Sequence, residues 1–216
     1  MTTATRRPVV AGLFFPEDAE VLAADVKRLL DGVQPAAGSG SLTRRPRALI
    51  VPHAGYRYSG PVAASAYACL RPFAGEISRV VLLGPAHRVY LQGMAVPSDA
   101  AFSTPLGEVP VDLDLVEQVA RLPGVVVGDE PHAREHSLEV QLPFLQVVLG
   151  EFTLVPIVVG DCAGEQVARV LEVLRNAPGT LFVISSDLSH YLPYKAARAV
   201  DEETSRAIVA CRGDIT

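Results

Sequence analysis

Three apolar runs, each closely followed by a histidine, constrain the fold more than any other feature of this chain. The runs are Ala48–Val51, Arg79–Pro85 and Thr180–Asp187, and the histidines that follow them are His53, His87 and His190. Runs that are apolar throughout, without a period of two, are typical of strands buried on both faces of a parallel sheet. Helical patterns lie between them. We therefore expect an α/β fold, a single domain with a central, mostly parallel or mixed sheet and helices on both faces.

The same pattern predicts where a functional site should lie. In an open α/β sheet, ligands bind in the loops at the carboxyl ends of the strands. The three strands should thus deliver His53, His87 and His190 to one edge of the sheet. The two other histidines, His132 and His136, also lie in predicted loops or at helix starts rather than inside an apolar stretch.

Histidines gathered in this way favour a metal site. Imidazole nitrogens are common ligands of iron, copper and zinc, and two histidines with one anionic residue form an open coordination set for non-haem iron. Acidic residues precede three of the histidines: Asp129 and Glu130, Glu135, and Asp187. Each could complete the coordination, orient an imidazole or cap a helix. We favour an active-site role for Asp187 and solvated loop charges for Asp129 and Glu130.

Other function classes find less support. Ser185 and Ser186 stand beside Asp187, close to His190, but neither serine lies in the G-x-S-x-G turn that exposes a hydrolase nucleophile. The chain contains no G-x-x-x-x-G-K-[ST] or G-x-G-x-x-G phosphate loop. Its net charge of -5 disfavours nucleic acid and anionic membranes as partners. No signal peptide or membrane span is recognisable, so we expect a cytoplasmic protein.

Local patterns give further expectations. Pro16 to Asp18 predicts the entry to an amphipathic helix that ends at Gly32. Val9–Pro16 predicts an extended segment, 102–107 a loop, and 33–46 a mobile loop. Ser137–Leu149 predicts one helix, with Ser137 as its cap and Pro143 as a kink. The three cysteines show no C-x-x-C pair, which predicts buried free thiols.

Six ordered motifs carry a family resemblance. They are VPHAGYRYSG, LLGPAHR, FSTPLGEVPVD, EHSLEVQLPFL, LVPIVVG and ISSDLSHYLPY, preceded by AGLFFPED. Together they resemble the Memo family, whose prokaryotic members are called AmmeMemoRadiSam system protein B. The resemblance implies a fold similar to LigB-type class III extradiol dioxygenases, with a histidine-lined pocket. It also implies that His53 and His87 bind a metal, and that His190 is placed like the acid/base of those dioxygenases.

The resemblance departs from the family pattern at one point. The family's third metal ligand is a cysteine in a Cys-Gly motif further towards the carboxyl end, and this sequence ends in CRGDIT before such a motif. Cys211 precedes Arg212 and is not given that role. We therefore expect residues 1–216 to form one Memo-like domain without the family's C-terminal segment. The expected metal is iron, with copper as the second choice, and the expected catalytic residues are His190, Asp187 and His136.

Three hypotheses for function remain open. The first is a metal-dependent redox protein, a dioxygenase-like oxidoreductase, in which the metal at His53 and His87 binds dioxygen or a small substrate and His190 moves a proton. The second is a module without enzymatic activity that binds a peptide or a partner protein. The third is metal-assisted hydrolysis. The family name further implies a radical-SAM protein and an Ammecr-domain protein as partners.

Overall fold

The computed structural model describes residues 4–34 and 42–212. The chain forms two compact units, Met1–Ser186 and Asp187–Thr216. The strands are β1 (Thr5–Arg6), β2 (Ala48–Val51), β3 (Arg79–Pro85), β4 (Met94–Val96), β5 (Ala101–Thr104), β6 (Gly107–Pro110), β7 (Val125–Val127), β8 (Thr153–Val159) and β9 (Thr180–Ser185). The helices are α1 (Ala19–Asp31), α2 (Tyr56–Ala68), α3 (Leu113–Ala120), α4 (Glu130–Ala133), α5 (Leu142–Leu149), α6 (Gly164–Leu174) and α7 (Tyr194–Val209), with short 3₁₀ helices at Arg71–Glu76 and Glu139–Gln141.

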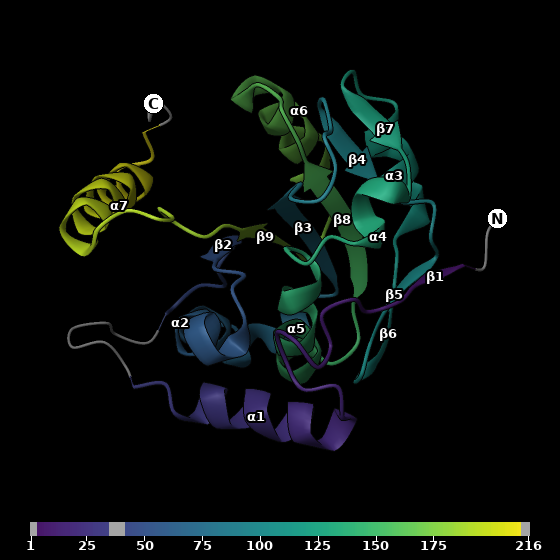
Figure 1. The fold of residues 1–216 in the computed structure, drawn as a ribbon. Coiled ribbons are helices and arrows are strands. Elements are labelled where there is room, and N and C mark those ends of the chain that lie inside the picture. The colour runs from purple at the N-terminus through teal and green to yellow at the C-terminus, as the bar shows by residue number, and fades with distance from the viewer. Residues whose placement is uncertain (1–3, 35–41, 213–216) are drawn as a thin grey trace. The chain divides into compact units, whose positions relative to one another are not determined.

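The main sheet is mixed, as the sequence predicts. In the described part of the chain its strand order is β2-β9-β3-β8-β4-β7 (Figure 1). Strands β2, β9, β3 and β8 are parallel, whereas β4 runs antiparallel to β8 and parallel to β7. A smaller sheet has the order β1-β5-β6. The carboxyl ends of β2, β9 and β3 therefore lie side by side at one edge.

Helices cover both faces of the main sheet. Alternate residues of β3 face opposite sides. A Cβ atom built on Gly84 would touch Ser137 and Leu138, which precede α5, whereas the neighbouring Leu83 lines a cavity with Val167 of α6. Helices α1, α2 and α5 contact one another, and α3 contacts α6. This arrangement confirms the predicted α/β fold.

Burial explains why the central strands are apolar throughout. The inner five residues of β3, and likewise those of β8, are buried because these strands lie in the middle of the sheet under helices. Strand β2 lies at the sheet edge, where Ile50 is exposed while Val51 is buried. Each buried aliphatic side chain contributes about 1.5–3 kcal/mol, so the central strands carry much of the stability of this unit.

Helix α1 follows its sequence signals. The Asp18 side chain accepts a hydrogen bond of 3.0 Å from the Val21 N–H and caps the helix. The buried residues of α1 recur at helical spacing and are Leu22, Val26, Leu29 and Leu30. Gly32 follows as the C-cap, so the prediction for this helix is confirmed at both ends.

The segment before α5 is not the single helix that the sequence predicts. A 3₁₀ helix covers Glu139–Gln141, and α5 begins only at Leu142. Pro143 lies in the first turn of α5, where a missing N–H breaks no helical hydrogen bond, so it causes no kink. Ser137 is not a cap, because its hydroxyl donates to the Pro85 carbonyl at 3.0 Å.

Three other local expectations were wrong. Residues 101–104 form β5, which pairs with both β1 and β6, so the predicted loop at 102–107 is half of a hairpin. Val9–Pro16 consists mostly of turns, with Gly12 at φ 78°. The three cysteines are free, as expected, but Cys69 and Cys211 are exposed and Cys162 is partly exposed rather than buried. The predicted mobile loop at 33–46 includes residues 35–41, which lie outside the described residues.

None of the described helices has the length and apolarity to cross a membrane.

Candidate metal centre

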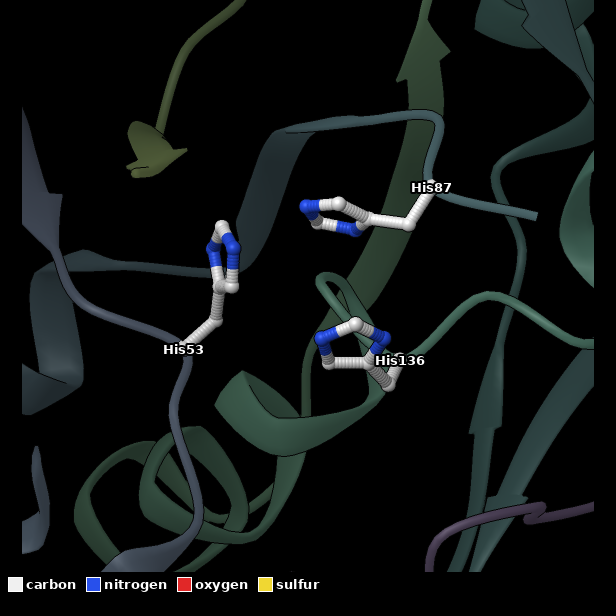
Figure 2. A group of neighbouring side chains, drawn as sticks. All are labelled: His53, His87 and His136. Atoms are coloured by element: carbon white, nitrogen blue, oxygen red, sulfur yellow. The ribbon is translucent and has the colours of Figure 1, made fainter. Parts of the chain in front are cut away.

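Three histidines from different parts of the chain meet in the first unit. His53 follows β2, His87 follows β3, and His136 lies between α4 and the 3₁₀ helix Glu139–Gln141. One potential ligand atom of each lies within 4.8 Å of the others, so the group could hold a metal ion. The ring centroids are 5.2 Å apart for His53 and His87, 5.6 Å for His53 and His136, and 4.7 Å for His87 and His136. Figure 2 shows the three rings gathered around a common space.

Ser185, the last residue of β9, fixes the proton on His53. Its hydroxyl donates its single proton to the Ser137 carbonyl at 2.6 Å and accepts a hydrogen bond of 2.8 Å from Gln141 Nε2. The Ser185 oxygen also lies 2.9 Å from His53 Nδ1. Since the hydroxyl proton is already donated, Nδ1 must be the donor in this contact. His53 Nε2 is then the nitrogen that can offer a lone pair to a metal.

Glu135 fixes His87 in the same way. Its carboxylate accepts a hydrogen bond of 2.9 Å from His87 Nδ1 and another of 2.6 Å from the His87 backbone N–H. A carboxylate can only accept, so Nδ1 carries a proton and Nε2 is the nitrogen suited to a metal. Carboxylates that orient metal-binding histidines through the second ring nitrogen are a recurring feature of metal sites.

The Glu135 carboxylate is held as an anion although it is buried. It also accepts hydrogen bonds of 2.8 Å from the backbone N–H groups of His136 and Ser137. Burial raises the pKa of Glu135, but the hydrogen bonds from His87 and the Ser137 backbone outweigh it and leave the pKa lowered. The sequence suggested three roles for such an acid, and the geometry shows the orienting one.

His136 completes the group. Burial lowers the pKa of His136. The Glu135 charge raises this pKa, whereas His87, His53 and Arg88 lower it further. The pKa is lowered as a result, so the neutral imidazole is favoured. Its Nδ1 is buried, has no hydrogen-bond partner among the described residues and lies 3.3 Å from a Glu135 oxygen. The Phe14 ring packs against it at 4.9 Å between centroids. From the sequence we expect His136 to act in catalysis, and this role stays a prediction. Its place in the histidine group was not predicted.

The two remaining histidines are His132 and His190. His132 is buried in α4, where burial lowers its pKa to about 4 and Nε2 contacts the Ala95 carbonyl at 3.1 Å. His190 belongs to the second unit, with Nε2 3.6 Å from an oxygen of Asp187. The catalytic roles expected of His190 and Asp187 stay predictions.

Asp129 is exposed, as expected for a solvated loop charge, but its carboxylate also makes specific contacts. Its carboxylate accepts hydrogen bonds of 2.7 Å from the Ser98 N–H and 2.6 Å from the Ser98 hydroxyl. Burial raises the pKa of Asp129, but these hydrogen bonds outweigh it and leave the pKa lowered. Asp129 therefore ties the start of α4 to the loop after β4. Glu130 is exposed, as expected.

A cavity of about 310 Å³ lies at the carboxyl ends of β3, β8 and β9. It is lined mainly by apolar residues, among them Leu83, Val159, Val167 and Ile184. Ser185 also lines it, and the same residue contacts His53. Ser185 thus links the cavity to the histidine group at the sheet edge, where ligands bind in folds of this kind.

Comparisons with known proteins give one consistent result. The family model described as Memo-like protein matches residues 6–212. A MEMO1 family protein of Aquifex aeolicus is 41% identical over 202 residues, which cover 91% of this chain and 72% of that protein. MEMO1 family proteins of Methanopyrus kandleri and Aeropyrum pernix are each 39% identical, over 95% and 94% of this chain and 76% of their own length.

Proposed function

The chain belongs to the Memo family, and on that premise we propose that it is a metal-dependent redox protein that holds iron, with copper as the second choice, at His53, His87 and His136. The observation that carries the proposal is the pair of fixed protons. Ser185 and Glu135 hold Nδ1–H of His53 and His87, so the Nε2 atoms are the potential ligands on both rings. In metal sites, a ligating histidine commonly donates the N–H of its other ring nitrogen to a neighbouring group in this way.

The donor set fits a divalent transition metal. It consists of three imidazoles, and these suit iron, copper and zinc alike. Since three side chains converge in the described part of the chain, an ion bound by them would keep open positions for a substrate.

The residues of the site have separable tasks in this proposal. A redox-active ion would supply binding and activation of dioxygen or of a small substrate. His53 is almost fully buried, whereas the His87 side chain is 38% exposed, so the substrate approaches from the His87 side. The cavity lined by Leu83 and Val167 offers room for an apolar part of the substrate. His190, paired with Asp187, is proposed to move a proton.

The proposed partners follow from the family name alone. We propose that a radical-SAM protein and an Ammecr-domain protein act with this chain, as components of an AmmeMemoRadiSam system. A pull-down with each purified partner tests this point apart from the chemistry.

Anaerobic iron(II) binding tests the proposal. We expect the wild-type protein to bind close to one equivalent, and the His53→Ala/His87→Ala variant to lose binding. His190→Ala serves as the control, because His190 is not one of the three proposed ligands, so its removal should leave iron binding intact while slowing dioxygen consumption. Equal and weak iron binding by the wild-type protein and the double variant would contradict the proposal.

A second candidate function, zinc-assisted hydrolysis, is favoured by one observation. Three histidines without a carboxylate are also the ligand set of zinc enzymes that activate water. The two functions separate by metal exchange. Zinc-loaded protein that hydrolyses esters, together with iron-loaded protein that consumes no dioxygen, would favour the second.

A further inference from the structure

Arg6 is a buried arginine close to the metal centre that the sequence analysis did not single out. It lies in β1, opposite Phe102 of β5, and is 5% exposed. The centre of its guanidinium group stands 5.4 Å from the Phe102 ring centroid. A buried arginine must be paired, because leaving its charge without partners inside a protein is costly.

The hydrogen bonds of the Arg6 side chain go to the segment that carries His136. Its Nε donates to the His132 carbonyl at 3.1 Å, and Nη2 donates to the Glu135 carbonyl at 2.6 Å. Its Nη1 forms an ion pair with Glu139, whose side chain is fully buried. One guanidinium group therefore binds residues on both sides of His136.

These contacts hold the peptide bond that leads into His136 at both of its polar atoms. The carbonyl of this peptide belongs to Glu135 and accepts from Arg6. Its N–H belongs to His136 and donates to the Glu135 carboxylate at 2.8 Å. A peptide fixed at both atoms cannot rotate as a unit, so the direction in which the His136 side chain leaves the backbone is fixed as well.

Glu139 extends the same network to the N-terminal segment. Its carboxylate accepts hydrogen bonds of 2.9 Å from the Val9 and Val10 N–H groups. Phe14, a few residues further along, packs against the His136 ring. The N-terminal segment thus binds the peptide that precedes His136 through Arg6 and packs against the His136 ring through Phe14.

We propose that Arg6 is a positioning residue of the metal centre: its guanidinium group fixes the Glu135–His136 peptide so that the His136 imidazole faces His53 and His87. This inference rests on the proposed metal binding by the three histidines. Arg6 itself touches no ligand atom of the group. Its effect passes through the backbone of Glu135 and His136.

Arg6→Lys is the variant that tests the proposal. Lysine keeps the charge that Glu139 needs, so the buried carboxylate is not left alone, but its single ammonium group cannot reproduce the fork that reaches two carbonyls and a carboxylate. The matched control is Arg79→Lys. Arg79 likewise pairs with a carboxylate, Asp112 at 2.7 Å, and with a carbonyl, Pro178 at 3.2 Å, but it lies at the opposite end of β3 from His87.

Cobalt(II) titration followed by visible absorption reads out the metal centre. We expect Arg6→Lys to bind cobalt(II) about tenfold more weakly than the wild-type protein, or worse, with a changed absorption band. Arg79→Lys should stay within about twofold of wild type even if both variants lose thermal stability equally. Wild-type cobalt(II) affinity in Arg6→Lys, or equal losses in both variants, would overturn the inference.

Amide hydrogen exchange in the metal-free protein provides a readout that does not depend on metal binding. The N–H groups of His136 and Ser137 should exchange faster in Arg6→Lys than in Arg79→Lys, because their acceptor, Glu135, is no longer held by its own carbonyl. If the wild-type protein bound no cobalt(II) or iron(II), the proposed function would fail, and this exchange would still decide the role of Arg6. Unchanged exchange of both amides would refute it.

Discussion

Glu135→Gln is the substitution whose consequences the structure defines best. The Glu135 carboxylate accepts four hydrogen bonds: Oε1 accepts from His87 Nδ1 and from the N–H groups of His136 and Ser137, and Oε2 accepts from the His87 N–H at 2.6 Å. Glutamine has nearly the same shape but only one acceptor oxygen. If that oxygen takes the place of Oε1, the amide NH₂ group faces the His87 N–H, donor against donor.

The expected magnitude follows from this exchange of groups. A hydrogen bond to a charged group contributes about 1.5–3 kcal/mol, and a buried donor left without an acceptor costs about 1–3 kcal/mol. The three bonds at the other oxygen persist but become weaker without the charge. We expect the free energy of unfolding to fall by about 3 kcal/mol, and metal affinity to fall about 10- to 100-fold because the hydrogen bond that orients the His87 ring becomes weaker.

Urea unfolding and metal titration measure these two quantities. Glu117→Gln is the matched control, because Glu117 forms an exposed ion pair with Arg121 on α3, and such pairs contribute at most about 1 kcal/mol. If Glu135→Gln changed the free energy of unfolding by less than about 0.5 kcal/mol and left metal affinity at the wild-type value, Glu135 could not be the residue that holds His87.

Two further predictions concern other buried groups. In the folded protein the pKa of His132 is lowered to about 4, below the value of 6.5 for a free histidine. As the pH falls, the unfolded chain therefore binds the proton first, and the free energy of unfolding should drop by about 3 kcal/mol in total between about pH 6.5 and pH 4. Urea unfolding of His132→Gln should show a free energy of unfolding that depends less on pH in this range. An identical pH dependence in both proteins would contradict this. Ser185→Ala removes the acceptor of His53 Nδ1, so it should lower the free energy of unfolding by about 1–3 kcal/mol and weaken iron(II) binding. Ser65→Ala, at an exposed site in α2, is the control. Equal effects of the two substitutions would argue against a special role for Ser185.

The strands and the helix signals are the part of the fold that the sequence predicts well. Bounds for β2 and β3 match the predicted runs, because a run of apolar side chains is a local pattern that burial in a sheet demands. The end of α1 at Gly32 is equally local. Strand β1 is missed since it has only two residues, and β5 is missed since its pairing partners are distant in sequence. The turn residues of segment 102–107 led us to expect a loop there.

The same division holds for the metal centre. The sequence by itself determined that His53 and His87 each follow an apolar strand, and strands that run parallel in one sheet present their carboxyl ends at one edge. Only the tertiary structure decided that His136 joins them and that Ser185, Glu135 and Arg6 hold the group in place. Arg6 meets Glu139 across 133 positions of sequence, and His53 meets Ser185 across 132. Such contacts leave no periodic pattern in the sequence. They form only when the sheet and its loops have brought distant segments within hydrogen-bonding distance, about 3 Å.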